Sequence, residues 1–198
     1  MMVKICGITT LEDALAAIDE GATALGFNFY PPSPRYIAPE AAAGIISELP
    51  KDTLKVGVFV NETAETVKAI ADEAGLDIVQ LHGKETPGQS PREYPVWKAF
   101  RVDANFSADQ LQAFPAEAYL LDSPTELYGG SGHSFDWNLA KGIGAHIILA
   151  GGLDASNIRR AVEVAQPWGV DACSKLEAAP GRKDRAKMSA FLRELRNL

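Results

Sequence analysis

The sequence predicts a closed (β/α)8 barrel of parallel strands, a TIM barrel, and two of its features support that prediction. Eight short apolar runs alternate with helical patterns or loops along the 198 residues. The runs are apolar at nearly every position, as in strands buried on both faces, and such alternation produces parallel β–α–β units with right-handed crossovers. Reactive polar residues follow several of the runs, and a closed barrel brings those strand ends together at one mouth.

An open, doubly wound sheet is the alternative arrangement of the same elements. It gives no reason for polar residues at so many strand ends, so we favour the barrel. The chain lies at the short end of the usual barrel range of roughly 200 to 400 residues. It contains no low-complexity stretch and no linker, and we therefore expect a single domain over residues 1–198.

The first strand is expected at residues 3–8, and a helix follows it directly. Thr9 and Glu12 have the S/T-x-x-E spacing of a capping box at a helix start. Gly21 stands where a C-terminal cap is expected. The apolar residues in between repeat at the spacing of one helix face: Leu11, Ala14, Leu15 and Ile18.

The next three strands are expected at residues 24–30, 55–60 and 78–83. A helix near residues 39–49 separates the first two, and a helix that ends at Gly75 separates the second from the third. The apolar face of this second helix consists of Val67, Ile70, Ala71 and Ala74.

Helical signals are weaker in the second half of the chain. Residues 84–94 include two prolines and a glycine, so any helix there is stunted. Ser107 and Gln110 form a second capping box before a brief helix. The remaining strands are expected at residues 96–102, 119–122, 146–150 and 170–173. The last two helices have apolar faces made of Ile158, Ala161, Val162 and Ala165, and of Met188, Phe191, Leu192 and Leu195.

Composition and charge exclude several classes of protein. The chain is 46% hydrophobic and 23% charged, as ordinary globular domains are. Its net charge of −7 argues against a general nucleic-acid surface, although it permits a local basic pocket for a small anion. No N-terminal apolar segment is long enough for a signal peptide or a membrane span. We therefore expect a cytoplasmic protein with neither nucleic-acid nor membrane partners.

The cysteines and histidines do not indicate a metal site. Two cysteines, Cys6 and Cys173, are too few for a disulfide framework or a metal cluster. His133 and His146 have no metal-ligand spacing to any Cys, Asp or Glu.

Cys6 stands where the first strand ends and a loop to a helix begins. In a parallel barrel this is the end at which chemistry takes place. A lone cysteine at such a position is more often a small buried core thiol. Its significance therefore depends on the residues around it.

Two loops late in the chain are candidates for a phosphate site. Gly151 and Gly152 follow the seventh strand, and Cys173, Ser174 and Lys175 follow the eighth. In barrels these two loops commonly hold a phosphate through backbone N–H groups. The glycine pair alone would indicate only a tight turn, but its combination with the eighth-strand loop favours phosphate.

Four further side chains are candidates at the mouth. Asp122 ends the sixth strand, where apolar neighbours can keep a carboxyl protonated for use as a general acid; a turn-forming aspartate is the alternative. Arg35 follows a proline-rich loop, and its planar fork suits a substrate carboxylate unless it is a solvated surface arginine. Gln80 and His82 share one face of the fourth strand, where they either line the mouth or are structural.

The run Lys4-Ile5-Cys6-Gly7-Ile8-Thr9 resembles the opening motif of the phosphoribosylanthranilate isomerase family of tryptophan biosynthesis. The resemblance continues in the same order over nearly the whole chain. The further matching segments are residues 26–27, 33–37, 56–61, 79–83, 120–122, 129–132, 135–137, 150–153, 177 and 180–184.

The resemblance implies an Amadori rearrangement, which needs no cofactor and no metal. It implies that Cys6 is the base, that Asp122 is the acid and that Arg35 holds the anthranilate carboxylate. The loops after the seventh and eighth strands would hold the substrate phosphate. Gly130, in the glycine-rich loop at residues 129–132, is implied as a further substrate-binding residue.

Residues 171–177 depart from the family pattern Asp-x-Ser-Ser-Gly-Val-Glu, because Cys173 replaces a serine and Lys175 replaces a glycine. A positive φ at this position would strain a lysine, whereas an ammonium beside a phosphate adds a favourable hydrogen bond. We expect the charge to be at least neutral for binding. Since the first and eighth strands are neighbours in a barrel, we also expect Cys6 and Cys173 to lie near enough for a disulfide.

Two other functions stay open at this point. A histidine-pathway aminoaldose isomerase catalyses a similar rearrangement on the same fold, but enzymes of that kind have an aspartate where Cys6 stands. A barrel that binds phosphate without catalysis is the second, and the changes at Cys173 and Lys175 keep it open. As partners we expect a phosphorylated small molecule and no protein, so that the chain is a monomer, with a dimer as the alternative.

Overall fold

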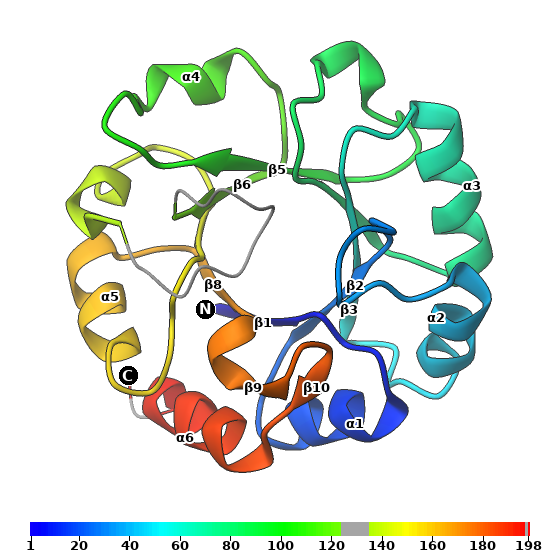
Figure 1. Cartoon of the computed structure of the whole chain (residues 1–198). Helices are drawn as coiled ribbons and strands as arrows, with labels where there is room; N and C mark the ends of the chain where they lie inside the picture. Colours follow the sequence, from blue (N-terminus) through cyan, green and yellow to red (C-terminus); the bar gives the residue numbers. More distant parts are fainter. Residues whose placement is uncertain (124–134, 197) are drawn as a thin grey trace.

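The computed structural model describes residues 1–123, 135–196 and 198. Parallel strands close into a barrel in which each strand pairs with the next and β8 pairs with β1 (Figure 1). The strands are β1 Met2–Cys6, β2 Ala24–Asn28, β3 Leu54–Phe59, β4 Ile78–Leu81, β5 Val96–Arg101, β6 Ala118–Asp122, β7 Ile147–Leu149 and β8 Gly169–Ala172. The predicted barrel is confirmed, and the hydrogen-bonded pairing of β8 with β1 excludes an open sheet.

The helices form a ring outside the barrel (Figure 1). They are α1 Leu11–Asp19, α2 Pro39–Ile46, α3 Ala64–Ala74, α4 Asp109–Gln112, α5 Ile158–Ala165 and α6 Arg185–Arg196. Short 3-10 turns occur at η1 Pro87–Gln89, η2 Trp137–Ala140 and η3 Ser174–Leu176. The stunted helix expected after β4 is the single turn η1. None of the helices in the described part of the chain is long and apolar enough to cross a membrane.

Both predicted capping boxes are wrong. Helix α1 is capped by Thr10, whose hydroxyl accepts from Asp13 N–H at 3.2 Å, because the neighbouring Thr9 hydroxyl donates instead to the Gly181 carbonyl. Helix α4 begins after Ala108, which has no capping side chain, so the predicted Ser107 lies one residue too early. The spacing of residues near Thr9 could not show that its hydroxyl donates a hydrogen bond to a segment far away in the sequence.

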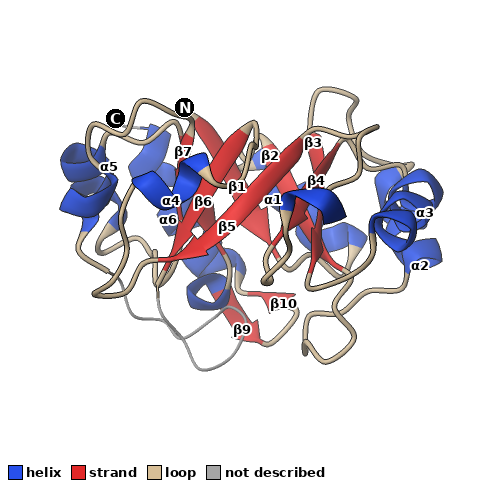
Figure 2. Ribbon diagram, turned by 90° about the horizontal axis from the view of Figure 1, so that it is seen from above, coloured by secondary structure: helices blue, strands red, loops and turns tan. Residues whose placement is uncertain are grey.

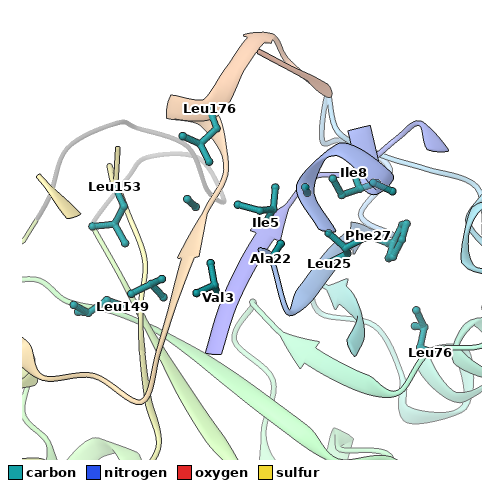
Figure 3. Close-up of a cluster of buried hydrophobic side chains, with 14 of the residues drawn as sticks. Val3, Ile5, Ile8, Ala22, Leu25, Phe27, Leu76, Leu149, Leu153 and Leu176 are labelled. Carbon is teal, nitrogen blue, oxygen red and sulfur yellow. The ribbon is translucent and has the colours of Figure 1, made fainter. Parts of the chain in front are cut away.

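Alternation along the strands decides which side chains reach the barrel interior. On β1, Met2 joins the inner apolar cluster, whereas Val3 and Ile5 join the outer one, so Lys4 and Cys6 face inward. The outer cluster packs between strands and helices (Figure 3). The inner cluster fills the barrel below the mouth and consists of Met2, Ala24, Val56, Ile78, Trp97, Ala99, Ala118, Leu120, Ile148 and Ala150.

The same alternation places polar side chains at the inward positions nearest the mouth. Gln80 is the next inward-facing residue after Ile78 on β4, and Asp122 is the next inward-facing residue after Leu120 on β6. On β8, Asp171 lies between two outward residues and therefore also faces inward. The interior is thus apolar below and polar at one end.

A short antiparallel hairpin, β9 Glu177–Ala179 and β10 Arg182–Lys183, follows η3 and was not expected from the sequence. Figure 2, turned by 90° from Figure 1, shows it beyond one end of the barrel. It brings the buried side chains of Glu177 and Lys183 beside Cys173, at the same end as the carboxyl terminus of β8.

Candidate active site

A cavity opens at the carboxyl ends of the strands, where the active sites of parallel barrels lie. It brings together every predicted site residue that the structure describes. These residues are Cys6, Arg35, Gln80, His82, Asp122, Gly151, Gly152, Cys173, Ser174 and Lys175. The predicted residue Gly130 and the loop at residues 129–132 lie outside the described residues, as does His133.

Cys6 and Cys173 are both free thiols, and their side chains contact one another at the ends of β1 and β8. Contact with Cys173 holds the pKa of Cys6 well below its ordinary value, with help from the charges of Lys4 and Lys183 and against the effect of burial. The same contact, together with burial, raises the pKa of Cys173, whose thiol donates to Glu177 Oε1 at 3.8 Å. The opposite shifts favour the thiolate form at Cys6.

Lys4 lies below Cys6 and has no exposed surface. Its Nζ donates to Asp171 Oδ1 at 3.0 Å, across the pairing of β1 with β8. Burial raises the pKa of Asp171 to about 7; the negative charges of Cys6 and Asp122 act in the same direction, and Lys4 opposes them. Burial would lower the pKa of Lys4, but the charges of Asp171 and Cys6 outweigh it and raise that pKa.

Asp122, His82 and Gln80 form a second group across the cavity. Gln80 Nε2 donates to His82 Nδ1 at 3.2 Å, which leaves the ring proton on Nε2, and that nitrogen lies 3.3 Å from Asp122 Oδ2. Asp122 Oδ1 accepts from the Ser123 backbone N–H at 2.8 Å. Gln80 Oε1 is buried without a hydrogen-bond partner among the described residues, and its side chain lines the cavity.

Arg35 reaches the cavity from the loop after β2 and pairs with Glu177 of the β9–β10 hairpin. Its Nε donates to Glu177 Oε1 at 2.8 Å and its Nη2 donates to Oε2 at 2.7 Å. The buried Lys183 ammonium lies 3.2 Å from Glu177 Oε1. Burial would raise the pKa of Glu177, but the hydrogen bonds from Arg35 and the charge of Lys183 outweigh it and lower that pKa.

Gly151 and Gly152 both have positive φ, +82° and +66°, which glycine adopts without strain. A side chain on Gly151 would also meet Asp122, since its Cβ would lie 2.7 Å from Oδ1. This loop therefore turns tightly against the acid group, with its backbone open to the cavity. Among the described residues, no three His, Cys, Asp or Glu side chains are placed to hold a metal ion.

A family model described as N-(5'-phosphoribosyl)anthranilate (PRA) isomerase matches residues 3–194. The chain belongs to this family. An N-(5'-phosphoribosyl)anthranilate isomerase of Solibacter usitatus is 58% identical over 193 residues, which are 97% of this chain and 96% of the relative. The enzyme of that name from Geobacter sp. strain M21 is 52% identical over 204 residues, covering 99% and 98%.

Solved structures of PRA isomerases agree with the fold. The enzyme of Thermus thermophilus superimposes with a TM-score of 0.93 at 40% identity, covering 100% of this chain and 99% of that one. A PRA isomerase in complex with reduced 1-(o-carboxyphenylamino)-1-deoxyribulose 5-phosphate superimposes with a TM-score of 0.86 at 38% identity, with both chains fully covered.

The departure from the PRA isomerase pattern at Lys175 does not strain the backbone. Among the described non-glycine residues, only Asn61 and Gln166 have positive φ, and Lys175 lies within the 3-10 turn η3. Of the two effects expected for this lysine, strain is therefore excluded. Its charge remains, at the edge of the cavity beside Ser174.

Two buried groups of this PRA isomerase site were missed as functional residues in the sequence. Lys4 stands inside an apolar strand, and Asp171 is an acid in another. A charged residue at an inward position of a buried strand is a signal that could have identified each of them. The ion pair between Lys4 and Asp171 could not be predicted from the sequence, because the two residues are 167 positions apart.

Proposed function

We propose that Cys6 and Asp122 carry out the isomerisation that gives this family its name, in tryptophan biosynthesis. The substrate is N-(5'-phosphoribosyl)anthranilate and the product is 1-(2-carboxyphenylamino)-1-deoxyribulose 5-phosphate. Asp122 protonates the ribose ring oxygen, which opens the ring to a Schiff base. The Cys6 thiolate then removes the proton from C2′, and the resulting enolamine tautomerises to the ketone.

One observation carries this proposal: the Cys6 thiol, whose pKa is lowered, and the Asp122 carboxyl group line the same cavity from opposite groups of strands. Only the thiolate form of a cysteine can act as a base, and a free cysteine titrates near 8.5. The contact with Cys173, which keeps the pKa of Cys6 low, therefore keeps the base ready at neutral pH. Because the reaction only moves protons within one molecule, it requires neither a redox partner nor a Lewis acid.

The remaining cavity residues suit the two ends of the substrate. Arg35 uses Nε and Nη2 for Glu177, so Nη1 is the nitrogen that would receive the anthranilate carboxylate. The backbone at Gly151 and Gly152 and the η3 turn with Ser174 and Lys175 would hold the phosphate. The PRA isomerase solved in complex with a reduced form of this product supports a site that accepts both ends of the molecule.

Gln80 and His82 would contact the substrate between its carboxylate and its phosphate. The Gln80 amide orients His82, and His82 orients Asp122. Gln80 Oε1 is a buried acceptor without a partner among the described residues, and because Gln80 lines the cavity it would accept a hydrogen bond from a ribose hydroxyl. Gly130 remains a predicted contact.

A turnover assay tests the function directly. The purified chain is expected to convert N-(5'-phosphoribosyl)anthranilate and to leave the histidine-pathway aminoaldose unchanged, because a cysteine stands where enzymes of that pathway have an aspartate. Turnover of the aminoaldose alone would assign the chain to the other pathway. Saturable binding of the anthranilate substrate without turnover would show a barrel that binds and does not catalyse.

We further propose a cytoplasmic monomer. Cys6 must stay reduced to act as a base, which suits a reducing compartment. The enzyme of Thermotoga maritima is dimeric and was solved as monomers generated from that dimer, so a dimer is the alternative state. Size-exclusion chromatography with light scattering, at concentrations used in the assay, distinguishes a monomer of 21.2 kDa from a dimer.

A further inference from the structure

Lys4 and Cys6 occupy successive inward positions of β1, so the ammonium lies directly below the sulfur. Cys6 lines the cavity, whereas Lys4 is fully buried and is not part of the cavity wall. Lys4 therefore has no route to a substrate. Any part it has in the reaction must act through Cys6.

The contact between Lys4 and Cys6 depends on a gap beside β2. Gly26 pairs with Cys6 in the barrel register, and a Cβ there would lie 2.7 Å from Cys6 Sγ and 3.0 Å from Lys4 Nζ. The sulfur and the ammonium thus share the space that the glycine leaves open. The negative charge of Cys6 raises the pKa of Lys4, as that of Asp171 does.

Asp171 is the other partner of this cation. It lies opposite Lys4 in the pairing of β1 with β8 and accepts from Nζ at 3.0 Å. A buried ammonium is costly unless it is paired. Because its own burial makes Asp171 a weak acid, with a pKa of about 7, this carboxylate satisfies Lys4 only in part. The Cys6 sulfur is the second anionic partner of Lys4.

Other titratable groups lie around Cys6 or face it across the cavity. Cys173 and Asp171 lie on β8 and its end, Lys183 and Glu177 on the β9–β10 hairpin, and Arg35 in the loop after β2, while Asp122 on β6 and His82 after β4 face it across the cavity. Lys183 contacts Glu177 and Cys173 through hydrogen bonds, on the hairpin side of the thiol pair. Lys4 is the cation on the other side of Cys6, inside the barrel.

We propose that Lys4 is a positioning residue for the general base, whose ammonium holds Cys6 as the thiolate from below while Asp171 orients that ammonium and shares its charge. This inference rests on the proposed function only in that Cys6 is the base. It predicts opposite effects for the two partners. Removing the cation makes the thiolate harder to form, whereas removing the nearby carboxylate makes it easier.

The test follows the Cys6 thiolate without substrate, in a Cys173→Ser background. Serine retains a hydroxyl donor, and Cys6 then is the sole cysteine in the chain. The rate of alkylation by iodoacetamide and the ultraviolet absorbance of the thiolate are measured against pH. In Lys4→Met the midpoint of both titrations is expected to rise by at least about one pH unit, which lowers alkylation about tenfold below the midpoint. In Asp171→Asn the midpoint is expected to fall.

The double variant Lys4→Met/Asp171→Asn separates charge from packing. It removes both charges from the barrel interior, so circular dichroism and melting temperature should recover relative to the single variants, while the titration midpoint should lie between those of the two single variants. Turnover should follow the same order: kcat of Lys4→Met falls below neutral pH and recovers as the pH rises, with KM nearly unchanged.

An unchanged midpoint in folded Lys4→Met would overturn the proposal. If that variant does not fold, an unchanged or raised midpoint in Asp171→Asn, or a midpoint in the double variant at or below that of Asp171→Asn, would overturn it equally. A parent protein whose Cys6 titrates low and shifts as expected, yet which does not turn over N-(5'-phosphoribosyl)anthranilate, would refute the proposed function and leave this inference standing.

Discussion

The two sides of the barrel mouth hold polar side chains in different ways. On the side of β1 and β8, Lys4, Cys6, Asp171 and Cys173 form a buried group joined by charge, which we call the base side. Across the cavity, Gln80, His82 and Asp122 form a chain of polar contacts, which we call the acid side. Buried charges shift the protonation of their neighbours strongly, whereas neutral donors chiefly orient them.

The two sides differ because a general base and a general acid need different surroundings. A cysteine is protonated at neutral pH unless its surroundings stabilise the thiolate, so the base side needs cations and a donor around the sulfur. An acid needs a proton and a fixed direction, and the hydrogen bonds from His82 and Ser123 fix the direction of the Asp122 carboxyl. Four experiments test this comparison, from the largest expected effect to the smallest.

Replacing Cys6 by alanine removes the base and leaves the acid side intact. We expect kcat to fall by roughly 10²–10⁴-fold, the usual contribution of a positioned base, while the substrate still binds. Steady-state kinetics and a binding titration measure the two effects. A correctly folded Cys6→Ala protein with near-normal kcat would show that the base side does not perform the proton abstraction.

Replacing Asp122 by asparagine keeps the shape of the acid side but removes its proton. We expect kcat to fall by up to the same order, because an amide cannot protonate the ring oxygen. Near-normal kcat in a folded Asp122→Asn protein would contradict this role. In the parent enzyme the pH profile should have a rising limb that reports formation of the Cys6 thiolate.

The direction in which the rising limb is shifted along the pH axis follows from the pKa of Cys6. Thiolate increases as pH rises, and the contact with Cys173 lowers the pKa of Cys6, so the limb should lie below the pH of an ordinary thiol. In Asp122→Asn this rising limb should be retained, because Cys6 is unchanged. A flat profile in the parent enzyme, with chemistry rate-limiting, would contradict the assignment of Cys6 as the base.

Oxidation tests the contact between the two thiols. Attack of the Cys6 thiolate on oxidised glutathione, followed by displacement by Cys173, would form a Cys6–Cys173 disulfide and release two reduced glutathione molecules. We expect activity to fall in proportion to the cross-linked fraction and to return with dithiothreitol. The control Cys173→Ser should show no intramolecular disulfide by mass spectrometry. Full activity in protein shown to be cross-linked would mean that Cys6 is not the base.

Lys175 lies at the edge of the cavity, outside both sides. Since its backbone is unstrained, Lys175→Gly should alter only the charge near the phosphate. We expect KM to change by less than about tenfold, equivalent to 1.4 kcal/mol, with kcat nearly unchanged. KM serves as a measure of affinity provided that chemistry is slow. A large fall in kcat at constant KM would place Lys175 in the transition state rather than in the phosphate loop.

Much of this site could be predicted because parallel strands end at one face of a barrel. Cys6, Asp122, Gln80 and His82 each stand at or just beyond the end of an apolar run, and the barrel brings all of them to one cavity. The phosphate-loop residues Gly151 and Lys175 meet there for the same reason. Strand periodicity is local, so spacing along the chain was sufficient to place these side chains.

The sequence by itself determined the barrel, the order of its strands and the side chains that converge at its mouth, because these depend on local apolar periodicity. Tertiary structure alone decided which thiol is the thiolate, that Lys4 pairs with Asp171, and that Arg35 pairs with Glu177 of a hairpin. It also decided that Thr10 caps α1, since Thr9 is bound by the hairpin residue Gly181. Protonation and pairing depend on burial and on neighbours brought from distant parts of the chain, which no local pattern contains.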